Sequence, residues 1–120
     1  MIIEVNVRNK IQELSGLDNK SVTLGGKIRG VHVPYIVVRR TSGLRMDAHD
    51  GGAGCVKSTF SVIIYTDGYA RAKTIARKLY DLGPVAGASR ILLSNESDVF
   101  EIAPGLYNTI LDYSIYYKED

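Results

Sequence analysis

PYIVVRRTSGLRMDAHDGGAGCVKSTFSVIIYTDGYARAKTIARKLYDLG, residues 34–83, is the stretch that decides the fold. Pro34 can open a strand, because a proline at a first strand position removes no internal ladder hydrogen bond. Residues 35–40 then place apolar groups on both faces before two arginines. The run 59–65, TFSVIIY, alternates two faces in β-branched and aromatic residues. We expect these two segments to pair as an antiparallel hairpin.

An amphipathic helix is predicted directly after this hairpin. Thr66 or Asp67 can cap its start, and Gly83-Pro84 can end it. At helical spacing one side carries an apolar arc of about 140°, formed by Tyr69, Ala72, Ile75, Ala76, Leu79 and Leu82. We expect that side to lie on the sheet. The other side is basic, as in a solvated helix face, with Arg71, Lys73, Arg77 and Lys78.

The N-terminal segment fits two patterns. Ile3, Val7, Ile11 and Leu14 recur at helical spacing, whereas Ile3, Val5 and Val7 also alternate as in a strand. We expect a helix, because residues 12–14 are good helix formers and Ser15-Gly16 offers a stop. A short edge strand is predicted around 21–24.

Strand patterns return in the last third of the chain, at 90–93, 99–102 and 108–117, with a turn-prone segment at 94–98. The last strand has an apolar face, Leu111, Tyr113, Ile115 and Tyr117, and a polar and aromatic face, Ile110, Asp112, Ser114 and Tyr116. The fold class predicted is α+β, a mostly antiparallel sheet with two helices packed on one face and a long hairpin loop at 43–55. Residues 1–120 are expected to form a single domain.

Composition excludes several classes of protein. The 120 residues, 45% hydrophobic and 23% charged, suit one globular domain, and a net charge of +2 is too mild to indicate a nucleic-acid partner. Cys55 is the one cysteine, so no internal disulfide is possible and a reducing, cytoplasmic place of synthesis is expected. We expect no signal peptide and no membrane span, since no apolar run approaches about 18 residues.

The 43–55 segment, GLRMDAHDGGAGC, is the part of the chain where function is expected to lie. Asp47, His49 and Asp50 could face a metal ion, but no fourth ligand on a rigid element accompanies them. The glycines at 51, 52 and 54 lack the lysine and the following helix of a phosphate-binding loop. We therefore expect neither a metal nor a cofactor.

Catalytic side chains are equally weakly indicated. Cys55 with His32 or His49 could act as nucleophile and base, yet no spacing demands that pairing. Acidic residues at 96, 98 and 101 lie in or beside a turn, where carboxylates mostly solubilise. We expect the protein not to be an enzyme.

Basic residues at 39, 40 and 45 and on the 66–82 helix form no single stripe, so sequence-specific nucleic-acid binding is not expected. Tyrosines 107, 113, 116 and 117 give the C-terminal segment an aromatic character that suits a protein interface. Partners are therefore expected to be proteins.

PYIVVRR, FSVIIYTDGYARAKTIARKLYDLG and LYNTILDYSIYY together resemble small phage tail-completion proteins, also called tail terminators or tail-to-head joining proteins, of long-tailed phages. The resemblance covers the second and last thirds of the chain, and the first third matches in shape only. It implies an α+β fold that assembles as a hexameric ring on the end of a tail tube. That ring stops tube growth and offers the surface for the head connector, without catalysis or cofactor, in the virion.

Candidate contacts with neighbouring subunits, the tail-tube protein and the head-tail connector protein are Arg45, Asp47, His49, Asp50, Lys57, Asp112 and Tyr116. They lie in the 43–55 segment, beside it, or on the polar face of the last strand. Two alternatives stay open at this point. One is a head-completion or connector-adaptor subunit, and the other is a small domain that binds a ligand under the 43–55 segment.

Overall fold

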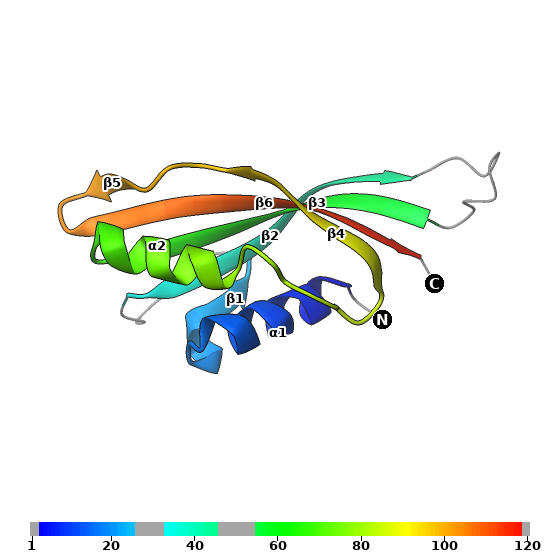
Figure 1. The fold of residues 1–120 in the computed structure, drawn as a ribbon, viewed down its shortest axis with the longest axis horizontal. Coiled ribbons are helices and arrows are strands. Elements are labelled where there is room, and N and C mark those ends of the chain that lie inside the picture. Colours follow the sequence, from blue (N-terminus) through cyan, green and yellow to red (C-terminus); the bar gives the residue numbers. More distant parts are fainter. Residues whose placement is uncertain (1–2, 26–32, 46–54, 119–120) are drawn as a thin grey trace.

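The computed structural model describes residues 3–25, 33–45 and 55–118. Its elements, in chain order, are α1 (Ile3–Ser15), the short helix η1 (Asn19–Ser21), β1 (Val22–Leu24), β2 (Tyr35–Arg45), β3 (Cys55–Thr66), α2 (Tyr69–Lys78), β4 (Ala88–Glu96), β5 (Phe100–Ala103) and β6 (Leu106–Lys118). The six strands form one sheet in the order β1-β2-β3-β6-β4, and β5 also pairs with β6 (Figure 1). The β1–β2 pair is parallel and the others are antiparallel. The predicted α+β class is confirmed.

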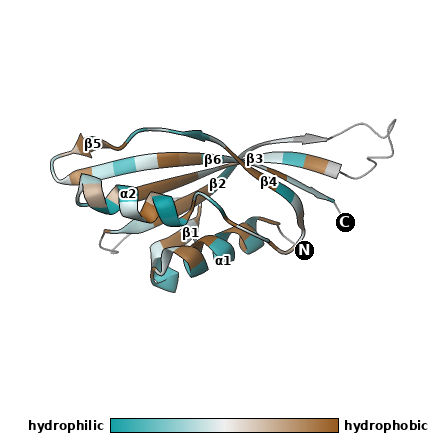
Figure 2. Cartoon of the chain, in the orientation of Figure 1, coloured by the Kyte–Doolittle hydropathy of each residue, from teal (hydrophilic) through white to brown (hydrophobic). Residues whose placement is uncertain are grey.

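Both helices pack on the same face of the sheet, as expected. Alternate residues of β2, β3 and β6 form the sheet side of the core: Ile36, Val38, Phe60, Val62, Ile64, Leu111, Tyr113 and Ile115. The helix side consists of Ile3, Val7, Ile11, Ile75 and Ala76. Figure 2 shows α1 as alternating hydrophobic and hydrophilic bands, the pattern of a helix that lies on a sheet. The opposite face of the sheet, called the open face below, carries neither helix.

α1 settles the ambiguity of the N-terminal pattern in favour of a helix. Ile3 and Val7 are buried, but Val5 is 39% exposed. A strand would have placed all three side chains on one face. The helix ends at the predicted stop, where Gly16 has a φ of 74° and its amide donates to the carbonyl of Gln12 at 3.1 Å. The edge strand expected at 21–24 is present as β1.

The start of α2 differs from the prediction. Its N-cap is Gly68, with no side-chain cap, and the Thr66 hydroxyl instead donates to the carbonyl of Gly68 at 2.9 Å. Tyr69, expected on the buried side, is 56% exposed. Tyr69 is the first residue of the helix, directly after the N-cap Gly68. Ala72, Ile75 and Ala76 are buried as predicted.

α2 also ends earlier in the chain than the predicted stop at Gly83-Pro84. The helix stops at Lys78, although Leu79 and Leu82 are buried as expected. A longer helix would need the carbonyl of Leu79 to accept from the amide of Gly83. Here the carbonyl of Leu79 accepts from the hydroxyl of Tyr113, and the amide of Gly83 donates to a carboxylate oxygen of Asp81 at 3.0 Å. Gly83 has a φ of 66°, which ends the segment in a turn.

The long loop expected at 43–55 is shorter than predicted, because strand pairing enters it from both ends. β2 continues past a bulge between Arg40 and Ser42, and Gly43 pairs with Ser58 and Arg45 with Val56. β6 extends alongside β3 over the same stretch, so three strands support one another there. The guanidinium of Arg40 lies over Gly43, in the space that a side chain at residue 43 would enter. Residues 46–54 lie outside the described part.

The three strands predicted in the last third are all present, and the first and last are longer than expected. β4 pairs with β6 around bulges at residues 89 and 94. At each bulge a serine hydroxyl donates to a carbonyl of β6, Ser89 to Tyr116 and Ser94 to Asp112, both at 3.0 Å. The predicted alternation of β6 is confirmed, since Leu111, Tyr113 and Ile115 are buried and the residues between them are partly exposed.

Replacing Tyr113 with phenylalanine tests whether its hydroxyl ends α2. The variant keeps the ring in the core but leaves the buried carbonyl of Leu79 without its donor. We expect a loss of about 1–2 kcal/mol in the free energy of unfolding, measured by urea denaturation. Tyr116→Phe, on the partly exposed face of the same strand, is the matched control and should change it by less than about 0.5 kcal/mol. Equal stability of Tyr113→Phe and the parent would contradict this role.

The pH dependence of stability gives a second test at the same residue. Burial, assisted by the nearby Glu96 carboxylate, raises the pKa of the Tyr113 hydroxyl above its ordinary value. Below about pH 10 the Tyr113 hydroxyl keeps its proton in both the folded and the unfolded chain. Just above pH 10 the hydroxyl loses its proton in the unfolded chain but keeps it in the folded chain, which lowers the free energy of unfolding. The difference in the free energy of unfolding between the parent and Tyr113→Phe should therefore decrease by about 1 kcal/mol between pH 10 and 11. A constant advantage over that range, in calorimetry or urea titrations, would refute the pKa shift.

Candidate functional site

A row of two cations and one aromatic ring crosses the open face. Tyr116 of β6 pairs in register with Lys57 of β3 on one side and with Arg90 of β4 on the other. The Nζ of Lys57 and the Cζ of Arg90 each lie 5.9 Å from the centre of the Tyr116 ring. Each contact is worth roughly 0.5–1 kcal/mol at an exposed site. The ring thereby holds two positive charges close together on the surface.

Asp112 lies on the same face, two alternating positions before Tyr116 along β6. Its carboxylate accepts a hydrogen bond of 2.6 Å from the hydroxyl of Ser61, its register partner on β3. Arg39 of β2 pairs with Ser61 from the other side. Three of the predicted contact residues, Lys57, Asp112 and Tyr116, are thus brought together on one surface.

The other predicted contact residues are not placed on that surface. Arg45 is the last residue of β2 and pairs with Val56, and its side chain lies outside the described part. Asp47, His49 and Asp50 belong to residues 46–54, which the structure does not describe. Their expected role as interface residues stays a prediction.

The half of the open face nearer β5 is aromatic and apolar. Tyr35 and Tyr65 stack with ring centres 4.7 Å apart at 21°. Burial, with the neighbouring Tyr65, raises the pKa of Tyr35. Next in this row come Asn108 of β6, opposite Tyr65, and Phe100 of β5, opposite Asn108. The Oδ1 atom of Asn108 is buried and has no hydrogen-bond partner, an unusual state for an amide oxygen.

The two arginines that end the predicted strand point to opposite faces, as alternation along a strand requires. Arg39 belongs to the open face, whereas the Nε of Arg40 donates to the Ser58 hydroxyl at 2.9 Å. That hydroxyl also lies 3.0 Å from the hydroxyl of Tyr117, on the face that carries the helices. The pair therefore contributes one exposed cation to the open face and one structural cation to the other.

The basic side of α2 is partly neutralised. Arg71 pairs with Asp67 at 3.4 Å, and the Nζ of Lys73 lies 4.0 Å from a carboxylate oxygen of Glu96. Glu96 also accepts a hydrogen bond of 2.6 Å from the hydroxyl of Tyr80, which raises the pKa of that tyrosine. These pairs tie α2 to the end of β4 and reduce the positive charge that the helix presents.

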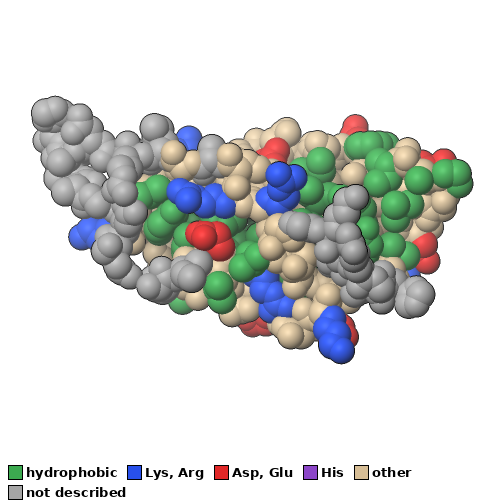
Figure 3. Space-filling model, turned by 180° about the vertical axis from the view of Figure 1, so that it is seen from behind, with side chains coloured by type: hydrophobic (Ala, Val, Ile, Leu, Met, Phe, Trp, Pro, Cys, Tyr) green, Lys and Arg blue, Asp and Glu red, His purple; other side chains and the backbone are tan. Residues whose placement is uncertain are grey.

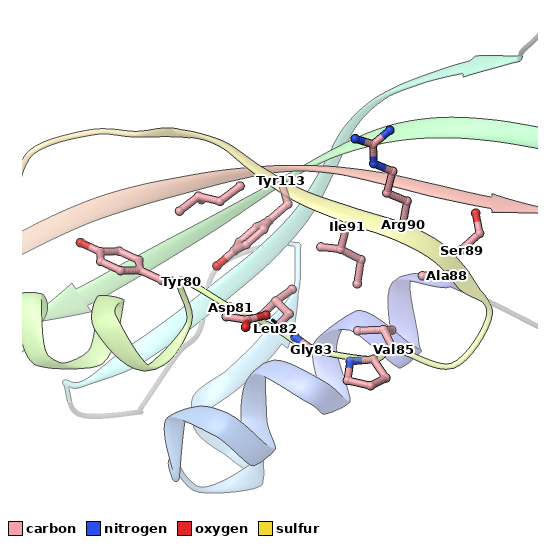
Figure 4. Close-up of a pocket in the computed structure, with 12 residues that line it drawn as sticks. Tyr80, Asp81, Leu82, Gly83, Val85, Ala88, Ser89, Arg90, Ile91 and Tyr113 are labelled. Carbon is pink, nitrogen blue, oxygen red and sulfur yellow. Dashed lines mark hydrogen bonds between the residues drawn. The ribbon is translucent and has the colours of Figure 1, made fainter.

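A small pocket of about 290 Å³ lies between the segment after α2 and β4 (Figure 4). Tyr113 forms its inner wall, and Asp81, Val85 and Ile91 line it from the two sides. Figure 4 shows the guanidinium of Arg90 pointing away from this pocket, toward the open face. The carboxylate of Asp81 is already bonded to the amide of Gly83.

The remaining chemical candidates lie largely outside the described residues. His32 and His49 both lie outside the described part of the chain. Only the backbone of Cys55, at the start of β3, is described. Within residues 3–25, 33–45 and 55–118, no three His, Cys, Asp or Glu side chains gather as metal ligands would. No helix in these ranges is long and apolar enough to cross a membrane.

Two residues of the open face were not singled out from the sequence. Arg90 joins the Lys57–Tyr116 row only because a bulge at residue 89 sets its register, and bulges have no clear sequence signal. Phe100, 49% exposed, was predicted only as part of a strand. Its position between the exposed Asp98 and Glu101 was the available signal, because an apolar residue among acidic turn residues is poorly placed for a core.

The sequence was compared with family models and with characterised proteins. No protein-family model matches the chain, and no curated protein matches it.

Proposed function

We propose that this chain is a virion assembly protein that forms a ring on the end of a phage tail tube, stops tube growth and provides the head-tail joining surface. The observation that carries the proposal is the open face of the sheet. Helices cover one face and complete the core there. The other face carries partly exposed tyrosines, the exposed Arg39 and Arg90, and the exposed apolar side chains Leu92 and Phe100. Such side chains are enriched in protein interfaces.

The mixed character of that face suits assembly. Its β5 half offers aromatic and apolar area from Tyr35, Tyr65 and Phe100, which can exclude water from a contact. Its other half offers charges around Tyr116, which orient a partner and set specificity. A ring subunit needs one surface for each neighbour and others for the tube and the connector. The proposal requires no catalysis and no cofactor.

The sequence resemblance supports the same proposal, because its three segments map onto the frame of the structure. They contain the first part of β2, most of β3 with α2, and nearly all of β6. These elements form the centre of the sheet and one of its covering helices. The resemblance therefore covers the strands β2, β3 and β6, whose outward side chains form the centre of the open face.

A ligand-binding function has one observation in its favour, the pocket beside β4. Its volume of about 290 Å³ lies just below the usual range for ligand sites, which begins at about 300 Å³. Two of its polar side chains, Asp81 and Tyr80, already bond to Gly83 and Glu96. The pocket therefore ranks behind the open face. A rise in melting temperature with a nucleotide or metal ion would favour it.

Electron microscopy of tails assembled without this protein tests the proposal. We expect overlong tubes, because nothing then caps the growing end. Complementation with Lys57→Ala/Arg90→Ala/Tyr116→Ala should leave the tubes overlong, since this variant removes the charged row of the open face. Complementation with Lys20→Ala/Lys78→Ala, two exposed lysines of η1 and α2, should restore normal length.

Two results of that experiment would count against a tail terminator. Tubes of normal length in the absence of the protein would contradict the proposal outright. Leaking or tailless heads with normal tubes would instead assign the chain to head completion or the connector. A protein that neither self-associates nor binds the tube subunit at high concentration would exclude both assembly roles.

A further inference from the structure

The molecule is elongated, 51 × 25 × 23 Å, and the end that holds β5 is acidic. Residues 97–107, called the acidic tip below, contain Asp98 and Glu101 and no lysine or arginine. Both carboxylates belong to exposed residues. The same tip exposes 49% of Phe100 and 42% of Ile102. In Figure 3 hydrophobic side chains gather at the right-hand end, which holds β5, with acidic side chains at its rim.

The opposite half of the open face carries what we call the basic patch, Arg39, Lys57, Arg90 and Lys118. Lys57 and Arg90 flank Tyr116 at 5.9 Å, and Lys118 follows Tyr116 on the same face of β6. Arg39, Arg90 and Lys118 are exposed and Lys57 is partly exposed. The patch comes from four strands, β2, β3, β4 and β6, so the sheet itself fixes its layout.

Among the described residues, few carboxylates balance the positive charge of this patch. Asp112 is the one acidic residue in the sequences of β3 and β6, and its carboxylate is already bonded to Ser61. No ion pair joins any of the four cations to a carboxylate among the described residues. Like charges held this close repel, so a partner with negative charge would be attracted to the patch.

The two surfaces are far apart on the same subunit. Phe100 pairs with Asn108, and Tyr116 lies eight positions after Asn108 in β6, or about 27 Å along a strand. The tip therefore cannot reach the patch of its own chain. It can reach the patch of a second copy, and the exposed ring of Phe100 can then stack on Tyr116 or an arginine.

We propose that the acidic tip of one copy docks on the basic patch of the next copy. Tip against tip and patch against patch would each oppose like charges, so the contact is heterologous, head to tail. Repeated around a closing rotation, a heterologous contact makes a ring. The inference deepens the proposed function and rests on it for the ring, since it names the two surfaces that neighbouring subunits bring together.

Charge reversal tests the contact in the purified protein. One variant reverses the two patch charges that flank Tyr116, Lys57→Glu/Arg90→Glu, and a second makes the tip basic, Asp98→Lys/Glu101→Lys. Sedimentation at concentrations up to millimolar measures self-association of each variant and of the parent. We expect either variant alone to self-associate at least about tenfold more weakly than the parent. Their equimolar mixture should recover association, because in an alternating chain each tip again meets charges of opposite sign beside Tyr116.

Matched controls reverse the same number of charges elsewhere. Lys20→Glu/Lys78→Glu and Glu13→Lys/Asp18→Lys alter exposed residues of the helical side and should associate as the parent does. Glu101 accepts a hydrogen bond from the amide of Gly105 at 3.2 Å, so its reversal could disturb the turn. Asp98→Asn/Glu101→Gln keeps an acceptor there and should still weaken association. Circular dichroism and the melting temperature confirm that each variant is folded.

Three outcomes would overturn the inference. The first is a parent protein that stays monomeric at millimolar concentration. The second is self-association of the patch and tip variants as strong as that of the parent. The third is a mixture of the two variants that associates no more strongly than either variant alone. Raised salt should also weaken the parent's association, since exposed charges are screened. If the reversals have no effect but tails still end at normal length only with the protein present, the contact is wrong and the proposed function stands. If tube length does not depend on the protein, the proposed function fails instead.

Discussion

The pairing of β6 with β3 is the constraint on which the rest of the structure depends. Twelve register pairs join the two strands, from Cys55 opposite Lys118 to Thr66 opposite Tyr107. Because side chains alternate along a strand, this register places Tyr113 and its neighbours in the core beneath the helices and Tyr116 on the open face. A slip by one residue would exchange the two faces. One ladder therefore sets both the stability of the domain and the surface proposed to assemble.

Local periodicity predicted most of the fold, and long-range contacts explain the errors. The helices and strands were predicted because their apolar residues recur at the right spacing. α2 ends earlier than predicted because the carbonyl of Leu79 accepts a hydrogen bond from the hydroxyl of Tyr113, 34 residues further along the chain. Pairing with β3 likewise extends β2 as far as Arg45, into a segment whose glycines predicted a loop. For the candidate site, Tyr116 followed from the alternation of the last strand and Lys57 from its place beside the 43–55 segment, whereas Arg90 required the register of a bulged pair.

The distribution of charge connects the fold with the proposed assembly. An open sheet covered by helices on one face leaves the other face to carry interactions, and here that face is apolar near β5 and basic toward the far ends of β3 and β6. A single contact between exposed charges is weak. Contacts repeated around a ring and anchored on a tube gain strength from effective concentration. On the proposed function, the chain would be monomeric when dilute and assemble on a tube end.

Cross-linking between neighbouring copies tests the central claim, head-to-tail contact, most directly. Cys55 is the only native thiol, so Cys55→Ser provides a background into which Phe100→Cys or Arg90→Cys is introduced singly. With a short thiol cross-linker, the account predicts dimers from a mixture of the two variants and little product from either alone. A chain carrying both cysteines should give a ladder of oligomers. Phe100→Cys cross-linking to itself as efficiently as the mixture does would contradict the account.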